Sequence, residues 1–471
     1  MNNTHLPFET CRPVLANVDS DSTFFSRSRP SGYVPAGFSL LEIMIALTLG
    51  LLLSVGILGL FSGTSHTSKV QDGLARLQEN GRYAVSRIES DLRMSRGQYC
   101  SNNSGNAATG GSVATWGGRA PMVFATNLNL PDVGANNVSV DASGNLSNAT
   151  PAAAYALSPR YFMQGYRCVS GSCTPALPTG AGQIPASGLA AGRRVPNSDV
   201  LTVRYQRGSG WPMIIDGNCT TGGSITVSPQ AGDDPVAFKP GAGLALISDC
   251  QNPSVIPVSG VSGNAINIGP ILPGTPTCKA TALRDVRVFN FSEDFVTITY
   301  YLAFRNDDNP DARPNSAAAR RLIPTLIRRE NGVDQELVQG VDRLDFRFGV
   351  QESGGNVRYL SADLVDSRNG NTITCPNKAD GVAPNPSNLT ASEPGCLWRA
   401  VRTVEAHLLV NSVNDVSGLD DTSRTYRYSF TAAGAPAGNT IDQATLPSGL
   451  NLATMLRREF IAQSTNRNFA Q

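Results

Sequence analysis

One long apolar run near the N-terminus dominates the hydrophobic pattern of this chain. From Gly37 to Phe61 the sequence reads GFSLLEIMIALTLGLLLSVGILGLF, and after Glu42 the run carries no charge. A helix rises about 1.5 Å per residue, so roughly twenty apolar residues suffice to cross a hydrocarbon core of about 30 Å. The run therefore predicts a membrane-spanning helix.

Glu42 is the exceptional residue of this run. An ionised carboxylate inside an apolar span costs about 2.5 to 3.5 kcal/mol unless it finds a partner or reaches the interface. Because Arg27 and Arg29 precede the run, Glu42 lies near its cytoplasmic end and would be able to reach the headgroups of an ordinary anchor. A signal peptide cut after Phe61 is another interpretation, but the apolar segment of such signals is only about 7 to 15 residues long.

Beyond Phe61 the pattern becomes amphipathic. Apolar positions recur at steps of three and four, which predicts a helix with one buried stripe over residues 62–98. That stripe consists of Val70, Leu74, Leu77, Gly81, Val85, Ile88 and Leu92. Charged residues, Asp91 among them, are assigned to the exposed faces. No proline lies between Phe38 and Cys100, so the apolar and amphipathic halves are expected to form one helix.

Residues 99–471 have the pattern of a β-rich domain. Short β-branched segments alternate with Gly, Pro and Asn, which is typical of antiparallel sheet. The clearest are 199–205, 224–227, 243–248, 254–258, 264–268, 286–291, 295–304, 321–328, 344–350, 357–360 and 401–411. Residues 450–462 fit either a strand or a helix. The expected fold class is α+β, with a long N-terminal helix packed on an antiparallel, disulfide-containing domain that carries Gly/Pro/Asn-rich insertions.

Charge and motifs exclude several functions. The formal net charge of the 471 residues is +1 without a basic run, so no nucleic-acid partner is indicated. No GxSxG or CxxC motif occurs, and His407 is interpreted as a surface residue of a strand. We therefore expect no catalytic residue, no metal site, no cofactor and no enzymatic activity.

The cysteines predict a disulfide framework. Of the nine cysteines, Cys11 precedes the apolar run, which leaves an even number on the far side of the membrane. Eight cysteines allow 105 pairings, so the sequence does not determine the pairs. The local pairs are Cys168 with Cys173 and Cys375 with Cys396, leaving Cys219 with Cys250 and Cys100 with Cys278.

The start of the apolar run also resembles a known processing site. Gly37, Phe38 and Glu42 look like the cleavage motif of type IV prepilins, with a small residue before the cut, Phe as the first mature residue and Glu as the fifth. Further stretches resemble PilW-type minor pilins, namely LARLQENGRYA, LRMSRGQYC, SDVLTVRY, LISDCQNPSVIPVSGV, VTITYYLAF, IRRENGVDQELVQGVDRLDFRFGV and LRREF. The resemblance thus runs from Gly37 to the C-terminus and is interrupted around residues 101–195 and 367–398.

This resemblance implies both processing and function. A prepilin peptidase would cut between Gly37 and Phe38 and methylate the Phe38 amine. The expected division is a leader over 1–37, a transmembrane half-helix over 38–61, an amphipathic half over 62–98 and a periplasmic domain over 99–471. The mature chain would lie in the bacterial inner membrane and assemble, through Glu42, with other minor pilins, the major pilin and a pilus-tip adhesin. It would prime and cap type IV pili used in twitching motility, adhesion or DNA uptake.

Two alternatives share parts of this pattern. A minor pseudopilin of type II secretion would have the same N-terminal motif and architecture. A membrane-anchored periplasmic enzyme or binding protein would only mimic the motif, and its N-terminus would keep the leader or be cut after Phe61. The N-terminus of the mature protein separates this second alternative from a pilin.

Overall fold

The computed structural model describes residues 37–95, 121–126, 128, 139–140, 146–147, 154–156, 159–169, 171–178, 183–214, 223–229, 243–248, 253–274, 276, 286–307, 322–352, 355–373, 396–414, 428–429 and 455–465. Its chain divides into two units, residues 1–63 and residues 64–471. Within the described residues, the first unit is helical from Leu40 onward, and the second contains sheets and short helices around the rest of the same helix.

Helix α1 runs without interruption from Leu40 to Met94. At 55 residues it is about 80 Å long. In the described part of the chain it is the one helix long and apolar enough to cross a membrane. The predicted buried stripe is confirmed from Leu77 onward, since Leu77, Gly81, Ile88 and Leu92 are buried, whereas Leu74 is largely exposed.

Two antiparallel sheets form the body of the second unit. The six-stranded sheet has the order β16-β15-β14-β7-β5-β6 and the four-stranded sheet the order β18-β17-β19-β20. Their strands are β5 (Met163–Val169), β6 (Ser172–Thr174), β7 (Val200–Gln206), β14 (Phe295–Asn306), β15 (Leu322–Glu330), β16 (Val333–Gln339), β17 (Val341–Gln351), β18 (Val357–Leu360), β19 (Val401–Asn411) and β20 (Arg457–Thr465).

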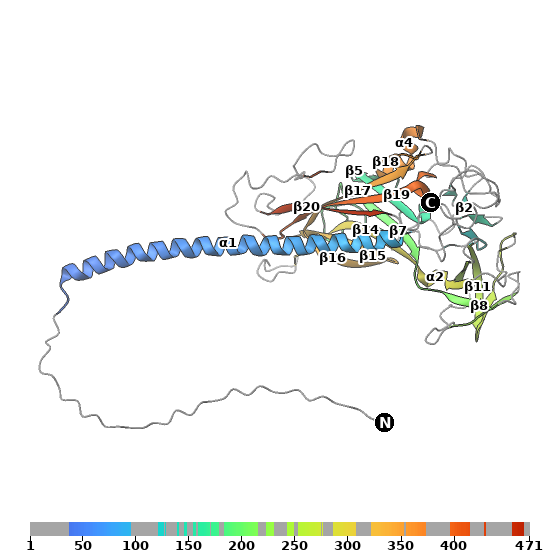
Figure 1. Ribbon diagram of the computed structural model, residues 1–471, viewed down its shortest axis with the longest axis horizontal. Helices are drawn as coiled ribbons and strands as arrows, with labels where there is room; N and C mark the ends of the chain where they lie inside the picture. Colours follow the sequence, from blue (N-terminus) through green and yellow to red (C-terminus); the bar gives the residue numbers. More distant parts are fainter. Residues whose placement is uncertain are drawn as a thin grey trace, which may run out of the picture. The chain divides into compact units, whose positions relative to one another are not determined.

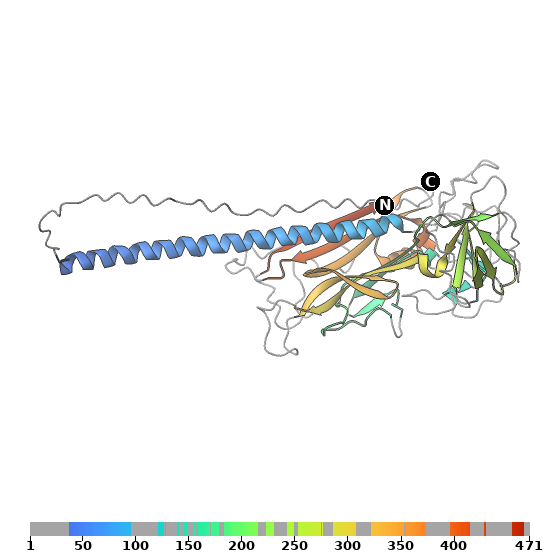
Figure 2. The same ribbon diagram turned by 90° about the horizontal axis from the view of Figure 1, so that it is seen from below.

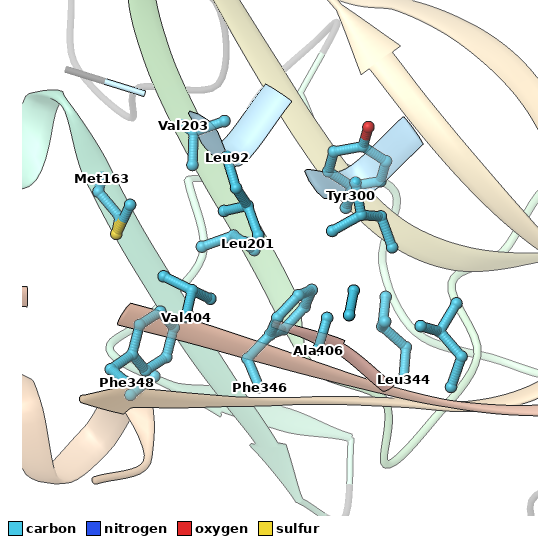
Figure 3. Close-up of a cluster of buried hydrophobic side chains, with 14 of the residues drawn as sticks. Leu92, Met163, Leu201, Val203, Tyr300, Leu344, Phe346, Phe348, Val404 and Ala406 are labelled. Carbon is cyan, nitrogen blue, oxygen red and sulfur yellow. The ribbon is translucent and has the colours of Figure 1, made fainter. Parts of the chain in front are cut away.

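The main hydrophobic core lies between these two sheets and the C-terminal part of α1. Figure 3 shows Leu92 of α1 above the inner faces of both sheets. Residues at every second position of β17 and β19, such as Phe346, Phe348, Val404 and Ala406, point into this core, as the period of a strand requires. Both sheets and the helix therefore bury their apolar faces against one another (Figure 1).

A third sheet is inserted between β7 and β14. Its strands are β8 (Trp211–Ile214), β9 (Ser224–Val227), β10 (Gly243–Ser248), β11 (Ser254–Ser262), β12 (Ala265–Ile268) and β13 (Arg287–Asn290). Following the pairings from β10 through β13, β8, β9, β12 and β11 leads back to β10, because β10 also pairs with β11. All these pairings are antiparallel, so the six strands close into a small barrel.

Side chains fill the inside of this barrel. Alternate residues, including Ile225, Val227, Ile266 and Ile268, form a hydrophobic cluster of their own. Strands β1 (Met122–Val123) and β4 (Tyr155–Ala156) extend the barrel sheet from β11. The remaining short elements are β2 (Ser139–Val140), β3 (Leu146–Ser147), η1 (Pro159–Tyr161), α2 (Phe291–Asp294), α3 (Ala362–Asp366), α4 (Arg368–Asn371) and η5 (Cys396–Ala400).

The structure confirms the predicted fold class of a long N-terminal apolar helix with an antiparallel, disulfide-containing β-rich part. Residues 450–462, which fitted either a helix or a strand, contain the start of β20, because β20 pairs with β19 over its whole length. β16 was not predicted from the sequence, because its mostly exposed side chains lack an apolar alternation.

Candidate assembly site

The apolar half of α1 is fully exposed. Every residue from Gly37 to Ser65 is exposed, and the Phe38 side chain retains 81% of its accessible surface. A Cβ atom added at Gly50, Gly56 or Gly59 would meet nothing within 4 Å. Nothing described in this chain covers the segment, so its apolar surface is available to lipid or to other helices.

Glu42 has a partner at the start of the same helix. Its backbone N–H donates to Ser39 Oγ at 3.2 Å, and the Ser39 N–H donates to Glu42 Oε2 at 3.3 Å. This reciprocal arrangement is a capping box, in which two of the unpaired N–H groups of a helix N-terminus are satisfied. Glu42 therefore stabilises the helix start in addition to any role in assembly.

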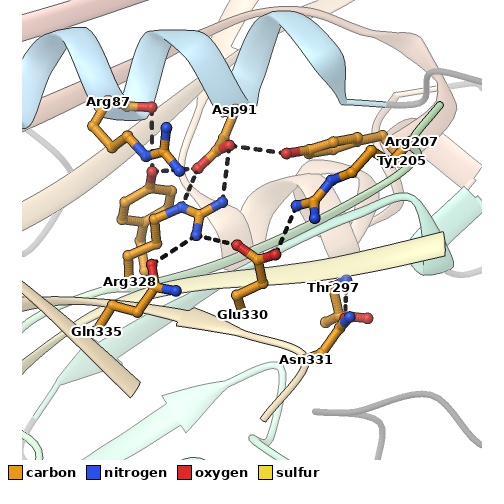
Figure 4. A network of polar contacts seen from close by, with 10 residues as sticks. Arg87, Asp91, Tyr205, Arg207, Thr297, Arg328, Glu330, Asn331 and Gln335 are labelled. Carbon is orange, nitrogen blue, oxygen red and sulfur yellow. Dashed lines mark hydrogen bonds and ion pairs between the residues drawn. The ribbon is translucent and has the colours of Figure 1, made fainter. Parts of the chain in front are cut away.

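A second polar site joins the other half of α1 to the six-stranded sheet. Asp91 lies on the buried stripe and is 3% exposed, which shows that its assignment to an exposed face was wrong. Arg328 of β15 contacts both carboxylate oxygens, with Nε 2.7 Å from Oδ2 and Nη2 3.3 Å from Oδ1. Tyr205 of β7 donates to Oδ1 at 3.0 Å and Tyr300 of β14 to Oδ2 at 2.6 Å. Asp91 thus contacts three adjacent strands (Figure 4).

The contacts extend from Arg328 along the sheet. Its Nη1 donates to Glu330 Oε2 and, at 3.0 Å, to Gln335 Oε1. Arg207 Nη2 donates to Glu330 Oε1 at 2.6 Å. We call Asp91, Tyr205, Arg207, Tyr300, Arg328, Glu330 and Gln335 the Asp91 network. Its members come from α1, β7, β14, β15 and β16 and from the residue after β7.

Burial and neighbouring charges shift the pKa values within the Asp91 network. Burial first, and then the negative charge of Asp91, raises the pKa of Tyr205 to about 12 and moves the pKa of Tyr300 well above its usual value. Burial alone would lower the pKa of Arg328, but its hydrogen bonds with Asp91 and Glu330 outweigh this and raise it. At neutral pH the tyrosines therefore stay protonated donors and Arg328 stays charged.

A glycine allows α1 to approach the four-stranded sheet. Gly81 is buried, and a Cβ atom at this position would lie 2.3 Å from Cζ of Phe460 in β20. Such a distance is far below van der Waals contact, so only glycine fits here without a shift of the ring. Gly81 and Asp91 together place one stripe of α1 against both sheets.

Part of the sheet side of these contacts lies in a region that matches a known family. The model of the type IV pilus-assembly protein W (PilW) family matches residues 311–465. This match covers less than half of the chain and includes Arg328, Glu330 and Phe460, which contact α1 or continue the Asp91 network. No curated protein and no solved structure matches the chain. The PilW match supports a function related to type IV pilus assembly.

The structure contains one of the disulfides that the sequence suggested. Cys168 of β5 and Cys173 of β6 are joined, with their Cα atoms 4.0 Å apart. The candidate partners Cys100, Cys219, Cys250, Cys278 and Cys375 lie outside the described residues. Cys396 begins η5, but its side chain also lies outside the description.

His407 was expected at the surface, and this expectation was wrong. It is 3% exposed, with Nδ1 2.9 Å from Glu459 Oε1 and Nε2 3.7 Å from Glu405 Oε2. The nearby Ser412 hydroxyl donates to the carbonyl of Asn414. No serine–histidine pair of the hydrolase type is formed among these residues. Within the described ranges, no cluster of three or more His, Cys, Asp or Glu side chains is arranged to hold a metal ion.

Proposed function

We propose that this protein is a minor pilin of the PilW type, which assembles with other minor pilins and the major pilin to prime and cap type IV pili. The observation that carries the proposal is α1, one continuous helix with an exposed apolar half and a half packed on a β-rich unit. The PilW match to residues 311–465 supports the same function.

Maturation in this proposal starts at the N-terminal boundary of the apolar half. A prepilin peptidase cleaves between Gly37 and Phe38, removes residues 1–37, and methylates the new N-terminus. Residues 38–61 then anchor the subunit in the bacterial inner membrane, and the β-rich unit lies in the periplasm. The span is long enough for this role, because about 20 apolar residues cross a bilayer.

Glu42 then provides the charge for assembly. After cleavage the Phe38 amine is positive, and both this amine and the Glu42 carboxylate lie in or beside lipid, where an uncompensated charge is expensive. A neighbouring subunit that brings its Phe38 amine to Glu42 neutralises both charges. An isolated anchor offers no such partner, so the pairing favours a stack of helices over a single one.

Because Glu42 also caps α1, its charge and its capping role must be tested separately. Glu42→Gln keeps a side-chain oxygen that completes a capping box but removes the charge. Ser39→Ala removes the cap at a cost of about 0.5 to 2 kcal/mol but keeps the charge. We expect Glu42→Gln to be cleaved and inserted yet to lose its minor-pilin partners, whereas Ser39→Ala keeps them.

The assay is purification of the full chain from membranes, followed by mass spectrometry of its N-terminus and of the partners. Recovery of pilin partners with an N-terminus at Phe38 supports the proposal. Wild-type recovery of partners by Glu42→Gln would refute the assembly role of its charge. Recovery of secretion components instead of pilus components would identify a minor pseudopilin. An intact leader, or a cut after Phe61, would identify a membrane-anchored enzyme or binding protein.

A further inference from the structure

The barrel of β8–β13 is a single insertion in the chain between β7 and β14, and β1 and β4 pair with it from outside that insertion. Gln206 and Phe295 face each other at the ends of β7 and β14, and the Arg207 N–H donates to the Asp294 carbonyl at 2.7 Å. The chain thus leaves and re-enters the six-stranded sheet through neighbouring positions. β7 and β14 therefore pair as two strands joined by a short turn would pair, although the barrel lies between them in the chain.

The barrel also lies outside the sequence that matches the PilW family. The matched residues, 311–465, begin after β13 has ended at Asn290. They contain β15, β17, β19 and β20, which build the two-sheet body that receives α1. The sequence shared with a pilus-assembly family therefore covers the four-stranded sheet and strands β15 and β16 of the six-stranded sheet, whereas the barrel and strands β5, β6, β7 and β14 lie before it.

Charged residues are rare on the barrel strands and common on the exposed faces of α1 and β16. Apart from Arg287, the barrel strands carry no charged residue, and their exposed side chains include Ser224, Ser259 and Ser262. The exposed faces of α1 and of β16 carry many charges, including Asp72, Arg76, Glu79, Arg82, Arg93, Asp334 and Glu336. Charged groups give an interface its specificity and orientation. The barrel wall is poorly suited to recognise a particular pilin by charge.

The barrel is held firmly against the two-sheet body. Leu246 and Phe289, on its outer side, pack with Phe162 and Phe295 of the body in a continuous buried cluster. Within this second unit, the barrel lies beyond the Met94 end of α1 (Figures 1 and 2).

From these observations we infer that the barrel is a module separate from the assembly surface, and that it remains exposed when the subunit is bound to its partners. This inference rests on the proposed pilin function, because it divides the molecule into a part that assembles and a part that does not. A contact made by the exposed side chains of the barrel strands uses mainly hydroxyl and apolar groups, so it depends weakly on salt.

The experiment compares two insertions of one short epitope tag in the full-length chain. The first lies between Gly263 and Asn264, the two-residue turn that joins β11 and β12 of the barrel. The matched control lies between Asn331 and Gly332, the two-residue turn that joins β15 and β16 of the body. Both turns join paired antiparallel strands, so the insertions differ mainly in location. Recovery of partner pilins and antibody access to the tag on intact piliated cells are measured.

We expect the barrel insertion to recover its partners at the wild-type level and to be accessible, and the control insertion to lose partner recovery or access. Loss of partners by a protease-resistant barrel insertion, or an inaccessible barrel tag in the assembled state, would overturn the inference. Equal tolerance and equal access of both tags would also overturn it. Failure of the untagged protein to bind pilins would instead refute the proposed function.

Substitutions provide a second test if the barrel insertion does not fold. Ser224→Lys and Ser262→Lys add charge to exposed positions of the barrel wall, and Ser90→Lys adds the same charge to an exposed position of α1. Partner recovery should be unchanged for the two barrel variants and reduced for the α1 variant. Loss of partners with either barrel variant would place the barrel within the assembly surface.

Discussion

The ion pair between Asp91 and Arg328 should be a major determinant of how firmly α1 is held on the sheet. Arg328 is 1% exposed at its side chain and Asp91 4%. Removing one partner of a buried pair leaves an uncompensated charge, which costs about 3 to 5 kcal/mol. Asp91→Ala leaves Arg328 with Glu330 and Gln335 as partners, so we expect it to lower the free energy of unfolding by about 3 kcal/mol, the lower end of this range. This is still a large share of the roughly 5 to 15 kcal/mol available to a domain.

A double-mutant cycle separates the pair from the loss of packing. Arg328→Ala should be at least as damaging as Asp91→Ala, because it leaves Asp91 with the hydroxyls of Tyr205 and Tyr300, whereas Asp91→Ala leaves Arg328 paired with Glu330. The double variant should lose much less than the sum of the two single losses, since neither charge then remains buried alone. Its stability stays below that of the wild type, because both hydroxyls lose a charged acceptor.

Denaturant unfolding of the detergent-solubilised full chain measures these differences. Intrinsic fluorescence is a suitable probe, because Trp398 is buried in the core that α1 covers. The matched control is Asp72→Ala, which removes the Asp72–Arg76 pair at 3.2 Å, with both side chains 64% exposed. An exposed pair of this kind contributes about 0 to 1 kcal/mol. A loss for Asp91→Ala as small as that of the control, or additive losses in the cycle, would refute the reasoning.

Two further outcomes follow from the same contacts. The pKa of Tyr205 is raised to about 12, against about 10 in the unfolded chain. Its contribution to stability is therefore complete below pH 10 and is lost as the pH rises toward 12. The denaturant midpoint of unfolding, measured between about pH 8 and 11, should fall less steeply for Tyr205→Phe than for the wild type. Gly81→Ala should lower the thermal midpoint, because the clash with the ring next to it costs about 1 to 3 kcal/mol, more than the gain in helix propensity of about 1 kcal/mol. Gly63→Ala, where an added Cβ meets nothing within 4 Å, should leave the midpoint unchanged or raise it; equal effects of the two substitutions would contradict the packing argument.

The sequence predicted α1 and many of the strands because their patterns are local. The apolar run and the spacing of Leu77, Ile88 and Leu92 depend only on the period of a helix. The capping box could also have been predicted from the sequence, because Ser39 and Glu42 have the S-x-x-E spacing just before an apolar run. Glu42 was predicted only to be a charge in the membrane, so its capping role is a finding of the structure.

Asp91 and His407 show why burial of polar residues was harder to predict. Asp91 is 237 residues from Arg328, and no local pattern identifies a partner at that distance. Its spacing of three from Ile88 did place it on the buried stripe, but its charge suggested the opposite. His407 is on the outer side of β19, away from the main core, yet the Tyr428 ring packs against it with centroids 6.3 Å apart. The alternation of β19 correctly places His407 on the outer face, but the Tyr428 ring, from another segment, covers it there.

The barrel was hidden for a different reason. Its strands were largely predicted, since 224–227 and 243–248 match β9 and β10. Closure depends on the pairing of β10 with both β11 and β13, and of β13 with β8. Strand propensity indicates which residues are extended but not which strands are neighbours. The sequence therefore predicted a single β-rich body, and the inserted barrel can be recognised only from the strand pairings of the structure.

The entry and exit of the barrel at neighbouring positions also affect how the chain folds. Pairing β7 with β14 directly requires closing a loop on the order of 90 residues, which costs about 3 kcal/mol more entropy than closing a short turn. A barrel that has already folded holds Arg207 next to Asp294, so the long loop then behaves as a tight one. Folding of the barrel first would thus convert a pairing of high contact order into a nearly local one and speed up formation of the six-stranded sheet.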